Sequence, residues 1–473
     1  MTVAETTEPR IRLLAVALLL AAGPLAARAG QVAPAELSAP LTRLLERGGA
    51  ELRISYTRQK EPATRLAPCL ARIEAFIDAL ARAGADRGVR FERQAQGERF
   101  ELAFAYRDRR QTLGLPDLVD WELDRQRGDV RYLPYDLEYR AAQAIWQVIA
   151  GREGRRIGLL AGPHMATGEL RVALEKNYPI VPWEQGRALP AGLRALLLAG
   201  PEGLDRSARR SLAEYLARGG SVVLAGGRIR LDARGEKPML RPVATGLDPW
   251  LAELGVRLER GLVMDESNSR LRRAAEPGEL DALVAKLGAR PEERPKRQPG
   301  GESGISLLTP CPAFVRLEDR DLAGHRATRG ARCNVLPAVS PVHCTHTESL
   351  RCQTLIRSSQ LACLREIGPR GCPVEQLSGA RAGETDARSA HPLAVALEGR
   401  FPGAEQRTGR LIVVGASAWI DDRALTLLRA ADPCVSTVVH SGRSFPLGNL
   451  RLLRAMLDWA VVDAELLAIR PRW

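Results

Sequence analysis

Three glycine-containing turns could bring chemically useful groups to one edge of a sheet. Gly162-Pro163-His164, Gly200-Pro201-Glu202-Gly203 and Gly226-Gly227 each follow a short apolar run. In open α/β folds, ligands bind at the carboxyl ends of the strands, which makes candidate ligand-binding residues of Gly162, His164, Gly226 and Gly227. None of the turns has the GxGxxG or GK[ST] pattern that cradles a phosphate. The favoured interpretation is tight turns with positive φ and a solvated histidine.

Ser417 has the pattern closest to that of a catalytic nucleophile. A nucleophile elbow needs Ser or Cys between two glycines after a strand. Gly415-Ala416-Ser417-Ala418-Trp419 lacks the second glycine, and a histidine would have to come from far away, as His391 or His440. The sequence therefore predicts no enzyme, and Ser417 stays a candidate for ligand binding. Asp421 and Asp422 follow Ser417. They could bind a cation, but capping of the next helix is the favoured interpretation.

The cysteines are unevenly placed. Six of the eight lie from Cys311 to Cys372, and no CxxC pair occurs. His343, Cys344 and His346 are close together but have no second ligand pair at a zinc spacing, so neither a metal nor a cofactor is predicted. In an oxidising compartment the cluster predicts about one to three disulfides, and their pairing stays open.

A small α/β domain is expected at residues 35–136. Leu52–Thr57 alternates apolar and polar residues, as a half-buried strand does. Apolar residues recur at helical spacing from Leu70 to Leu80, and further strands are expected at Val89–Glu92 and Phe100–Tyr106. A helix from Glu138 to Ile149 follows.

Short apolar strands alternating with amphipathic helices predict a doubly wound sheet, beginning in residues 137–287. Thr167 is expected to cap its first helix, and Asp205 or Ser207 the second. The expected strands are Ile157–Gly162, Leu193–Ala199 and Ser221–Ala225. Residues 288–386 read as an irregular cysteine-rich insertion, with a mobile loop at 288–303 that is rich in Pro, Arg, Glu and Gly. Residues 387–473 are expected to complete the domain with strands Leu393–Leu397 and Leu411–Val414 and a final helix, Leu450–Trp459.

The first 29 residues have the layout of a secretory signal peptide. Two arginines precede the apolar run Leu13–Ala27, which Pro24 interrupts, and Ala27-Arg28-Ala29 is a small-x-small cleavage site. An uncleaved membrane anchor is the alternative, although a span normally needs about twenty residues. Either interpretation predicts export.

The charge of the chain does not indicate nucleic acid. The net charge is +13, but the arginines are spread along the chain among Glu and Asp, and no basic cluster is flanked by aromatic residues. This distribution favours an ordinary solvated surface, and weak attraction to anionic phospholipid headgroups is favoured over nucleic-acid binding.

The ordered landmarks together resemble a known family, the GldG-like auxiliary components of ABC transporters, first associated with gliding motility. The resemblance covers most of residues 35–473. It rests on Leu52–Thr57, Tyr135–Tyr139, Arg156–Gly162, Leu170–Pro182, Ala195–Pro201, Tyr215–Gly220, Gly255–Leu258, Leu262–Asp265, Gly409–Ser417, Gly448–Leu450 and Leu466–Arg472.

This resemblance implies a location and partners. It implies an extracytoplasmic protein at the periplasmic face of a bacterial inner membrane, working beside an ABC-type ATPase and permease. It also implies a flavodoxin-like central domain related to amidotransferases and intraflagellar transport proteins but without their catalytic cysteine. Consistently, no cysteine lies in a strand-end turn of residues 157–230. The short N-terminal segment, the lack of a C-terminal membrane helix and the cysteine-rich stretch depart from the family pattern.

Three functions follow as hypotheses. The first is a non-catalytic auxiliary subunit of an ABC-type transport system that binds proteins or a ligand. The second is a periplasmic glycan- or peptide-binding module with its pocket at the Gly162 and Gly226 turns. The third is a hydrolase that uses Ser417.

Overall fold

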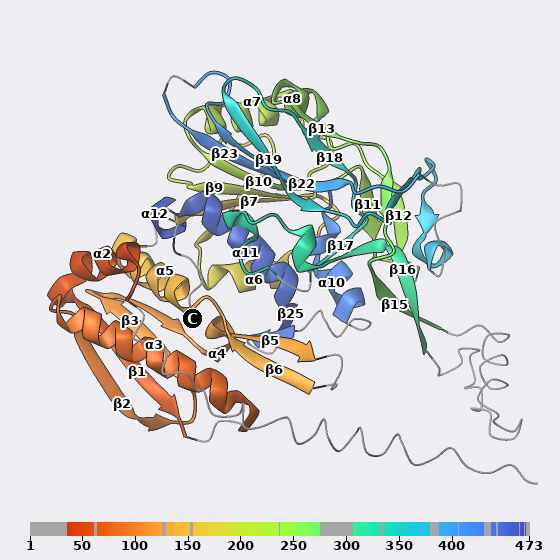
Figure 1. Cartoon of the computed structure of the whole chain (residues 1–473). Helices are drawn as coiled ribbons and strands as arrows, with labels where there is room; N and C mark the ends of the chain where they lie inside the picture. Colours follow the sequence, from red (N-terminus) through yellow and green to blue (C-terminus); the bar gives the residue numbers. More distant parts are fainter. Residues whose placement is uncertain are drawn as a thin grey trace, which may run out of the picture.

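The computed structural model describes residues 36–60, 64–124, 129–151, 155–235, 237–274, 306–331, 334–378, 387–404, 406–429, 437–440, 443–462, 464–467 and 469. The predicted export segment, 1–29, and the predicted loop, 288–303, lie outside these residues. Figure 1 shows a small N-terminal unit beside a larger one. None of the helices in the described part of the chain combines the length and apolar character needed to cross a bilayer.

The N-terminal unit is a four-stranded sheet with helices against it. The strands are β1 (Leu52–Gln59), β2 (Arg90–Gly97), β3 (Glu101–Tyr106) and β4 (Arg109–Leu113), in the order β2-β1-β3-β4. Leu52, Ile54 and Tyr56 of β1 are buried while Arg53, between the first two, is exposed, as strand alternation predicts. The helices are α2 (Ala39–Gly48), α3 (Ala67–Ala85) and α5 (Leu137–Ala150), and α5 packs on β3, β4 and α2. The short helix α4 (Leu115–Leu118) and the hairpin of β5 (Val119–Asp124) and β6 (Asp129–Pro134) lead into α5.

The large unit is built on a seven-stranded sheet. It contains β7 (Ile157–Ala161), β8 (Ile180–Pro182), β9 (Ala195–Ala199), β10 (Ser221–Ala225), β19 (Leu350–Arg357), β22 (Pro392–Gly399) and β23 (Gly409–Val414). Their order is β19-β22-β23-β10-β9-β7-β8. The strands from β23 to β8 are parallel, and β22 and β19 are antiparallel additions at one edge. Across the sheet, the parallel strands have the chain order 5-4-3-1-2.

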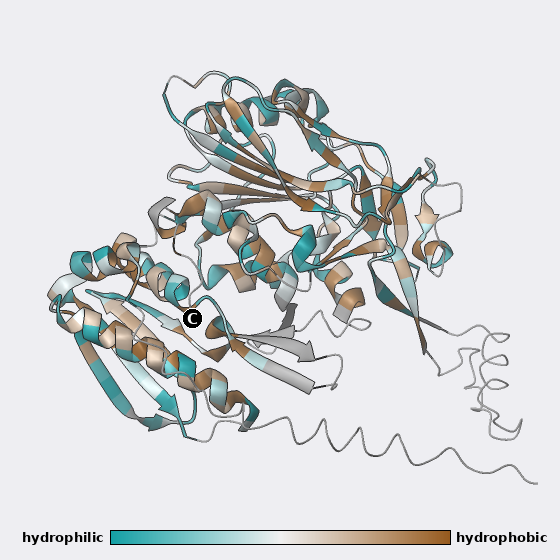
Figure 2. Ribbon diagram, viewed as in Figure 1, coloured by the Kyte–Doolittle hydropathy of each residue, from teal (hydrophilic) through white to brown (hydrophobic). Residues whose placement is uncertain are grey.

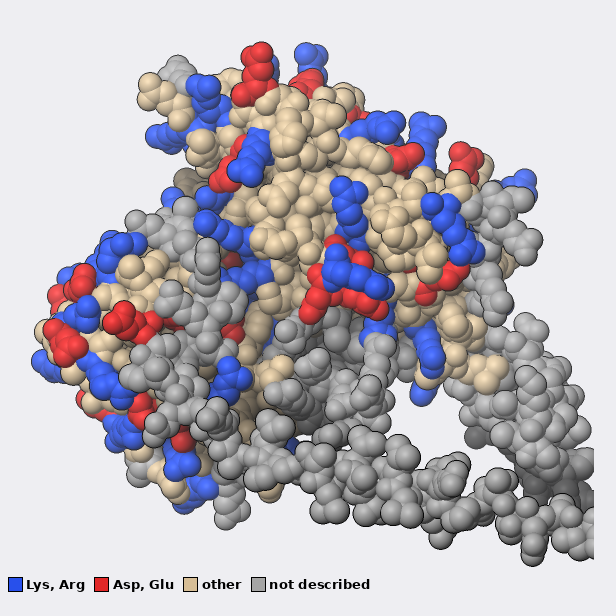
Figure 3. Space-filling model, viewed as in Figure 1, with Lys and Arg blue, Asp and Glu red and all other residues tan. Residues whose placement is uncertain are grey.

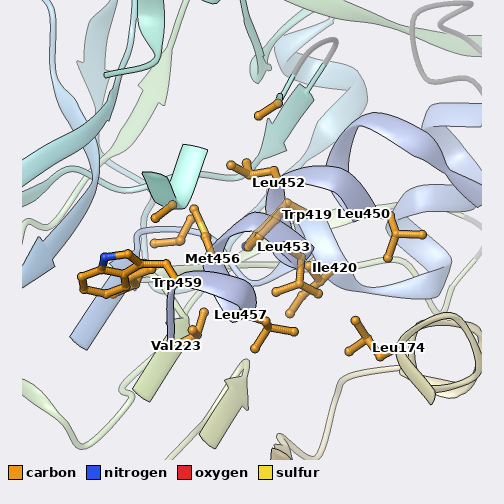
Figure 4. Packing of buried hydrophobic residues seen from close by; sticks show 14 of the residues in the cluster. Leu174, Val223, Trp419, Ile420, Leu450, Leu452, Leu453, Met456, Leu457 and Trp459 are labelled. Atoms are coloured by element: carbon orange, nitrogen blue, oxygen red, sulfur yellow. The ribbon is translucent and has the colours of Figure 1, made fainter. Parts of the chain in front are cut away.

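Both faces of this sheet are buried, since alternate residues of each strand enter different hydrophobic clusters. Leu197, Val223 and Ile412 face α6 (Gly168–Glu175) and α11 (Leu447–Val461). The neighbouring strand residues face α7 (Arg206–Ala217) and α8 (Asp248–Glu253), on the opposite side (Figure 1). Figure 4 shows α11 side chains, among them Met456 and Leu457, packed on the first face. The strands are accordingly apolar along their length in Figure 2.

The predicted α/β class is confirmed, and the expected strands and helices lie within a few residues of their predicted ends. The cysteine-rich region was predicted to be irregular, but it contains several strands. Residues 306–373 contain β16 (Ser306–Leu317), β17 (Asn334–Pro337), β18 (Val342–Cys344), β19, β20 (Cys363–Arg365) and β21 (Cys372–Pro373). Four of these strands, β16, β18, β20 and β21, pair with earlier ones: β15 (Asn268–Ala274), β13 (Val256–Leu258), β14 (Leu262–Met264) and β12 (Met239–Pro242), respectively. The strand β11 (Ile229–Asp232) pairs with β12. Pairing between strands this distant in sequence leaves little local periodicity.

The C-terminal segment adds a few short elements around α11. They are α10 (Asp422–Arg429), β24 (Thr437–His440), β25 (Arg443–Pro446) and α12 (Ala464–Leu467). Because α11 also approaches the N-terminal unit, it links the two halves of the molecule.

A buried polar network joins the two units. Asp458 of α11, which is 2% exposed, accepts hydrogen bonds from Gln143 of α5 and from Tyr178. Arg140 donates to Tyr135 Oη at 2.9 Å and to Gln143 Oε1 at 3.1 Å. Burial raises the pKa of Asp458, although the Arg140 charge opposes that shift. Loss of one member would leave buried polar groups unpaired, so the network fixes how the units meet.

Candidate functional site

The carboxyl edge of the parallel sheet is where the predicted site residues meet. Gly162, Gly200, Gly226 and Gly415 follow β7, β9, β10 and β23. The first three donate their N–H groups to the last carbonyl of the neighbouring strand, at 2.8, 2.8 and 2.9 Å. The turns therefore begin side by side, as the doubly wound pattern predicts.

Direct contact between backbones closes this edge. A Cβ on Gly162 would lie 1.8 Å from the carbonyl oxygen of Gly200, and a Cβ on Gly227 would lie 2.0 Å from that of Gly415. A Cβ on Gly415 would in turn lie 1.9 Å from the oxygen of Ser340, in the loop after β17. Glycine is needed at these positions because the neighbouring backbone occupies the space of a side chain.

The predicted positive φ is correct for one turn and wrong for another. Gly200 and Gly203 have φ of 57° and 59°. Gly226 and Gly227 are not among the positive-φ residues, and close backbone approach explains Gly227 instead. The sequence cannot show whether a glycine is needed for positive φ or for close backbone approach, because the second depends on how the turns pack.

His164 lies beside a carboxylate that the sequence did not assign to it. Its Nε2 is 3.6 Å from Oε2 of Glu202, which accepts two hydrogen bonds from Arg230 Nη1 at 2.8 and 2.9 Å. Nδ1 of His164 is buried without a partner among the described residues. The position of Glu202 near His164 could have been predicted, because its turn follows β9, the strand beside β7. Arg230 lies on β11, and no local sequence pattern indicates that it contacts Glu202.

A second ion pair lies on the same edge. Arg228 Nη1 is 2.9 Å from Asp248 Oδ2, and the Arg228 N–H donates to Ser340 Oγ at 3.1 Å. Together with the Glu202–Arg230 pair, this arrangement balances two cations with two anions. The paired charges therefore hold the loops of this edge together, and they leave no excess of one sign that would attract a charged ligand.

Ser417 is brought to this edge but not to a histidine. Its side chain is 7% exposed, and its Cβ lies 3.2 Å from where a Cβ on Gly200 would be. In the described part of the chain, no histidine ring is hydrogen-bonded to Ser417. His391 bonds through its ring to Ser389, and the side chain of His440 lies outside the description.

The two acidic residues after Ser417 cap helices, and one caps a helix far away in the sequence. Asp421 Oδ1 accepts from the N–H groups of Arg423 and Ala424 at 2.9 and 3.3 Å, at the start of α10, which confirms the capping prediction for Asp421. Asp422 instead accepts from two N–H groups at the start of α6, at 2.8 and 3.1 Å. The prediction for Thr167 is wrong, since its side chain makes no cap bond and Asp422 takes that role. By contrast, Asp205 caps α7 as predicted.

Within the described residues, the predicted disulfide region contains one disulfide, while Cys311 and Cys372 are free thiols. Cys344 of β18 is bonded to Cys352 of β19. His343 Nε2 lies 2.7 Å from Glu259 Oε2, and His346 Nδ1 accepts from the N–H of Cys352 at 3.2 Å. No group of three ligating side chains suited to a metal ion occurs within the described ranges.

Charge on the visible surface is mixed. Lys and Arg are interspersed with Asp and Glu over the face in Figure 3. No continuous basic area of the kind that binds a nucleic-acid backbone is seen on this face.

Comparisons with known proteins point to transport. Residues 155–284 match the model of the ABC_transp_aux family, described as an ABC-type uncharacterized transport system. This range begins before β7 and includes the turns of Gly162, Gly200 and Gly226. No curated protein matches the chain.

Two solved structures share limited likeness with the chain. One is a ThuA-like protein from Bacteroides uniformis, with 12% identity, 62% of this chain and 95% of that chain covered, and a TM-score of 0.24. The other is a β-galactosidase from Halorubrum lacusprofundi, with 14% identity, 74% and 40% covered, and a TM-score of 0.23. The family match thus makes residues 155–284 similar to an auxiliary component of an ABC-type transport system.

Proposed function

We propose that this protein is a non-catalytic, extracytoplasmic auxiliary subunit of an ABC-type transport system, and that it binds the permease and ATPase assembly at the inner membrane. The family match over residues 155–284 supports the relation to transport. The order of landmarks along the whole chain supports the finer GldG-like assignment.

We also propose that the large unit is flavodoxin-like. Counted along the chain, its parallel strands β8, β7, β9, β10 and β23 stand in the order 2-1-3-4-5, which is that of flavodoxin-like sheets. In this class, ligands enter between the ends of strands 1 and 3, which here are β7 and β9.

The contact between the β7 and β9 turns is the main support for a non-catalytic role. The β7 and β9 turns are in backbone contact at Gly162 and Gly200, and Ser340 closes the next turns. A ligand site of the flavodoxin kind needs a crevice there. A scaffold that binds protein partners through its outer loops needs no such crevice.

Two features support export. The N-terminal layout is that of a secretory signal, and Cys344 and Cys352 form a disulfide. Disulfides persist in oxidising compartments such as the bacterial periplasm.

The proposal is tested by co-purification. The tagged full-length chain is expressed together with an ABC ATPase and permease of the same genome, and membranes are solubilised in mild detergent. We expect all three proteins to elute together. Recovery of the chain as a free periplasmic monomer would contradict the proposal and favour the glycan- or peptide-binding alternative.

A second measurement addresses catalysis. Ser417→Ala removes only a hydroxyl, and no cap bond depends on it. We expect this variant to retain both the complex and transport. Gly415→Ala serves as the disrupting comparison, since its Cβ would meet Ser340 O at 1.9 Å. Loss of transport in a folded, complex-forming Ser417→Ala variant would favour the hydrolase alternative.

A further inference from the structure

A pocket of about 650 Å³ lies at the opposite edge of the large sheet, where β9, β10 and β23 begin. Its volume is within the range of small-molecule sites. Four arginines line it: Arg194, Arg218, Arg407 and Arg410. Among the described residues, no Asp or Glu is part of its lining.

Two of these arginines are held by the protein. Arg410 Nε lies 3.0 Å from Glu398 Oε1, and its Nη1 donates to the carbonyl of Trp459 at 2.6 Å. Arg407 Nη1 donates to the carbonyl of Arg218 at 3.3 Å. These bonds reach the last turns of α11 and α7, where cations stabilise the carbonyl ends of helices.

Helix capping does not account for the other two arginines. The guanidinium groups of Arg194 and Arg218 make no hydrogen bond or ion pair within the part of the chain that the structure describes. Both side chains are exposed at the mouth of the pocket. Arg410 is compensated by Glu398, so the like charges of Arg194, Arg218 and Arg407 remain around the hollow and repel one another, and a bound anion would offset that repulsion.

The rest of the lining is apolar or small. Leu189, Leu193, Tyr215 and Val461 contribute to it, together with the glycines that follow α7. Such a wall suits the organic part of an amphiphilic ligand, while planar guanidinium forks match the oxygens of a phosphate group.

We propose that this pocket binds a small organic phosphate, with the phosphate held by Arg194 and Arg218 and the organic part against Leu189 and Val461. The same chemistry is offered by a soluble phosphate ester and by an anionic phospholipid headgroup. The site is separate from the carboxyl edge of the sheet and does not depend on the proposed transport partners.

Two binding arms distinguish the two sources. In one, the full-length protein is titrated with glycerol 3-phosphate by calorimetry. In the other, it is sedimented with vesicles of phosphatidylglycerol, with phosphatidylcholine vesicles as the neutral comparison. Binding only in the first arm assigns a soluble ligand, and binding only in the second assigns a lipid headgroup. Absence of saturable binding in both arms up to about 10 mM phosphate overturns the proposal.

Charge-neutral variants test the residues. Arg194→Gln and Arg218→Gln are each expected to weaken binding about 10-fold, because each removes a charge-assisted contact. Arg206→Gln, on the same helix as the Arg218 turn but outside the pocket lining, carries the same charge change and should alter binding less than about 2-fold. Equal weakening by Arg206→Gln would mean that net charge, and not the pocket, attracts the anion, and would refute the site.

Discussion

Gly162→Ala is the substitution for which the packing gives the clearest expectation. The new Cβ would lie 1.8 Å from the carbonyl oxygen of Gly200, whereas Cβ atoms essentially never come within 3.0 Å of such an atom. The two turns would have to separate by at least about 1.2 Å. The hydrogen bond from the Gly162 N–H to the Ala199 carbonyl is 2.8 Å long, and that movement would stretch it beyond hydrogen-bonding range.

The cost of this change follows from two contributions. Overpacking a well-filled site costs about 1–3 kcal/mol, and loss of a backbone hydrogen bond adds about 1 kcal/mol. We therefore expect Gly162→Ala to lower the free energy of unfolding by about 2–4 kcal/mol.

A nearby glycine provides the matched control. In Gly168→Ala, at the start of α6, the new Cβ would be no closer than 3.8 Å to Asp422 Oδ2. Alanine in a helix is favoured over glycine by about 0.5–1 kcal/mol, so this variant should be neutral or slightly stabilised.

Denaturant unfolding followed by tryptophan fluorescence measures both variants. Amide hydrogen exchange then asks whether the loss is located at the ends of β7 and β9. If Gly162→Ala unfolds with a free energy within about 0.5 kcal/mol of the native chain, the argument that backbone contact closes this edge is wrong.

Three further predictions concern stability. Asp422→Ala removes the acceptor at the start of α6 and should cost about 1–3 kcal/mol, whereas Thr167→Ala should cost under about 0.5 kcal/mol; equal losses in denaturant unfolding would contradict this assignment of the cap. Burial lowers the pKa of His325, so the unfolded chain takes up the proton first as the pH falls. The stability from this group is complete above about pH 6.5 and is lost as the pH falls through the folded pKa; the urea midpoint should fall less steeply in His325→Gln, and an unchanged slope would exclude the effect. Replacing both Cys344 and Cys352 with serine opens a short loop and should cost about 2–3 kcal/mol; a reductant should destabilise the native chain but not this double variant.

Local patterns were sufficient for most of the large sheet. The strands at Ile157, Ala195 and Ser221 are continuous apolar runs because both faces of the sheet are covered, and such runs are visible without a structure. The prediction that Asp205 caps α7 also succeeded, because an N-cap and its helix are adjacent in sequence.

Prediction failed where the partner is distant in sequence. Asp422 caps a helix more than 250 residues earlier, so Thr167 was the only local choice. A separation of 28 residues hid Arg230 from Glu202, and pairing with strands far away in the sequence gave the cysteine-rich region its irregular appearance. The buried network around Asp458 was missed for this reason too, although the Tyr135–Tyr139 segment had entered through the family resemblance.

The α/β class, the alternation of strands and helices in the large sheet and the positions of its turns can be read from the sequence, because they depend on periodicity and on neighbouring residues. The role of the turns depends on how the strands pack together. This packing brings Gly162 onto Gly200 and Ser340 onto Gly415, and it gathers four arginines at the other edge. Closure of an edge and gathering of charge are properties of strands brought together across the sheet, and no single stretch of the chain contains them.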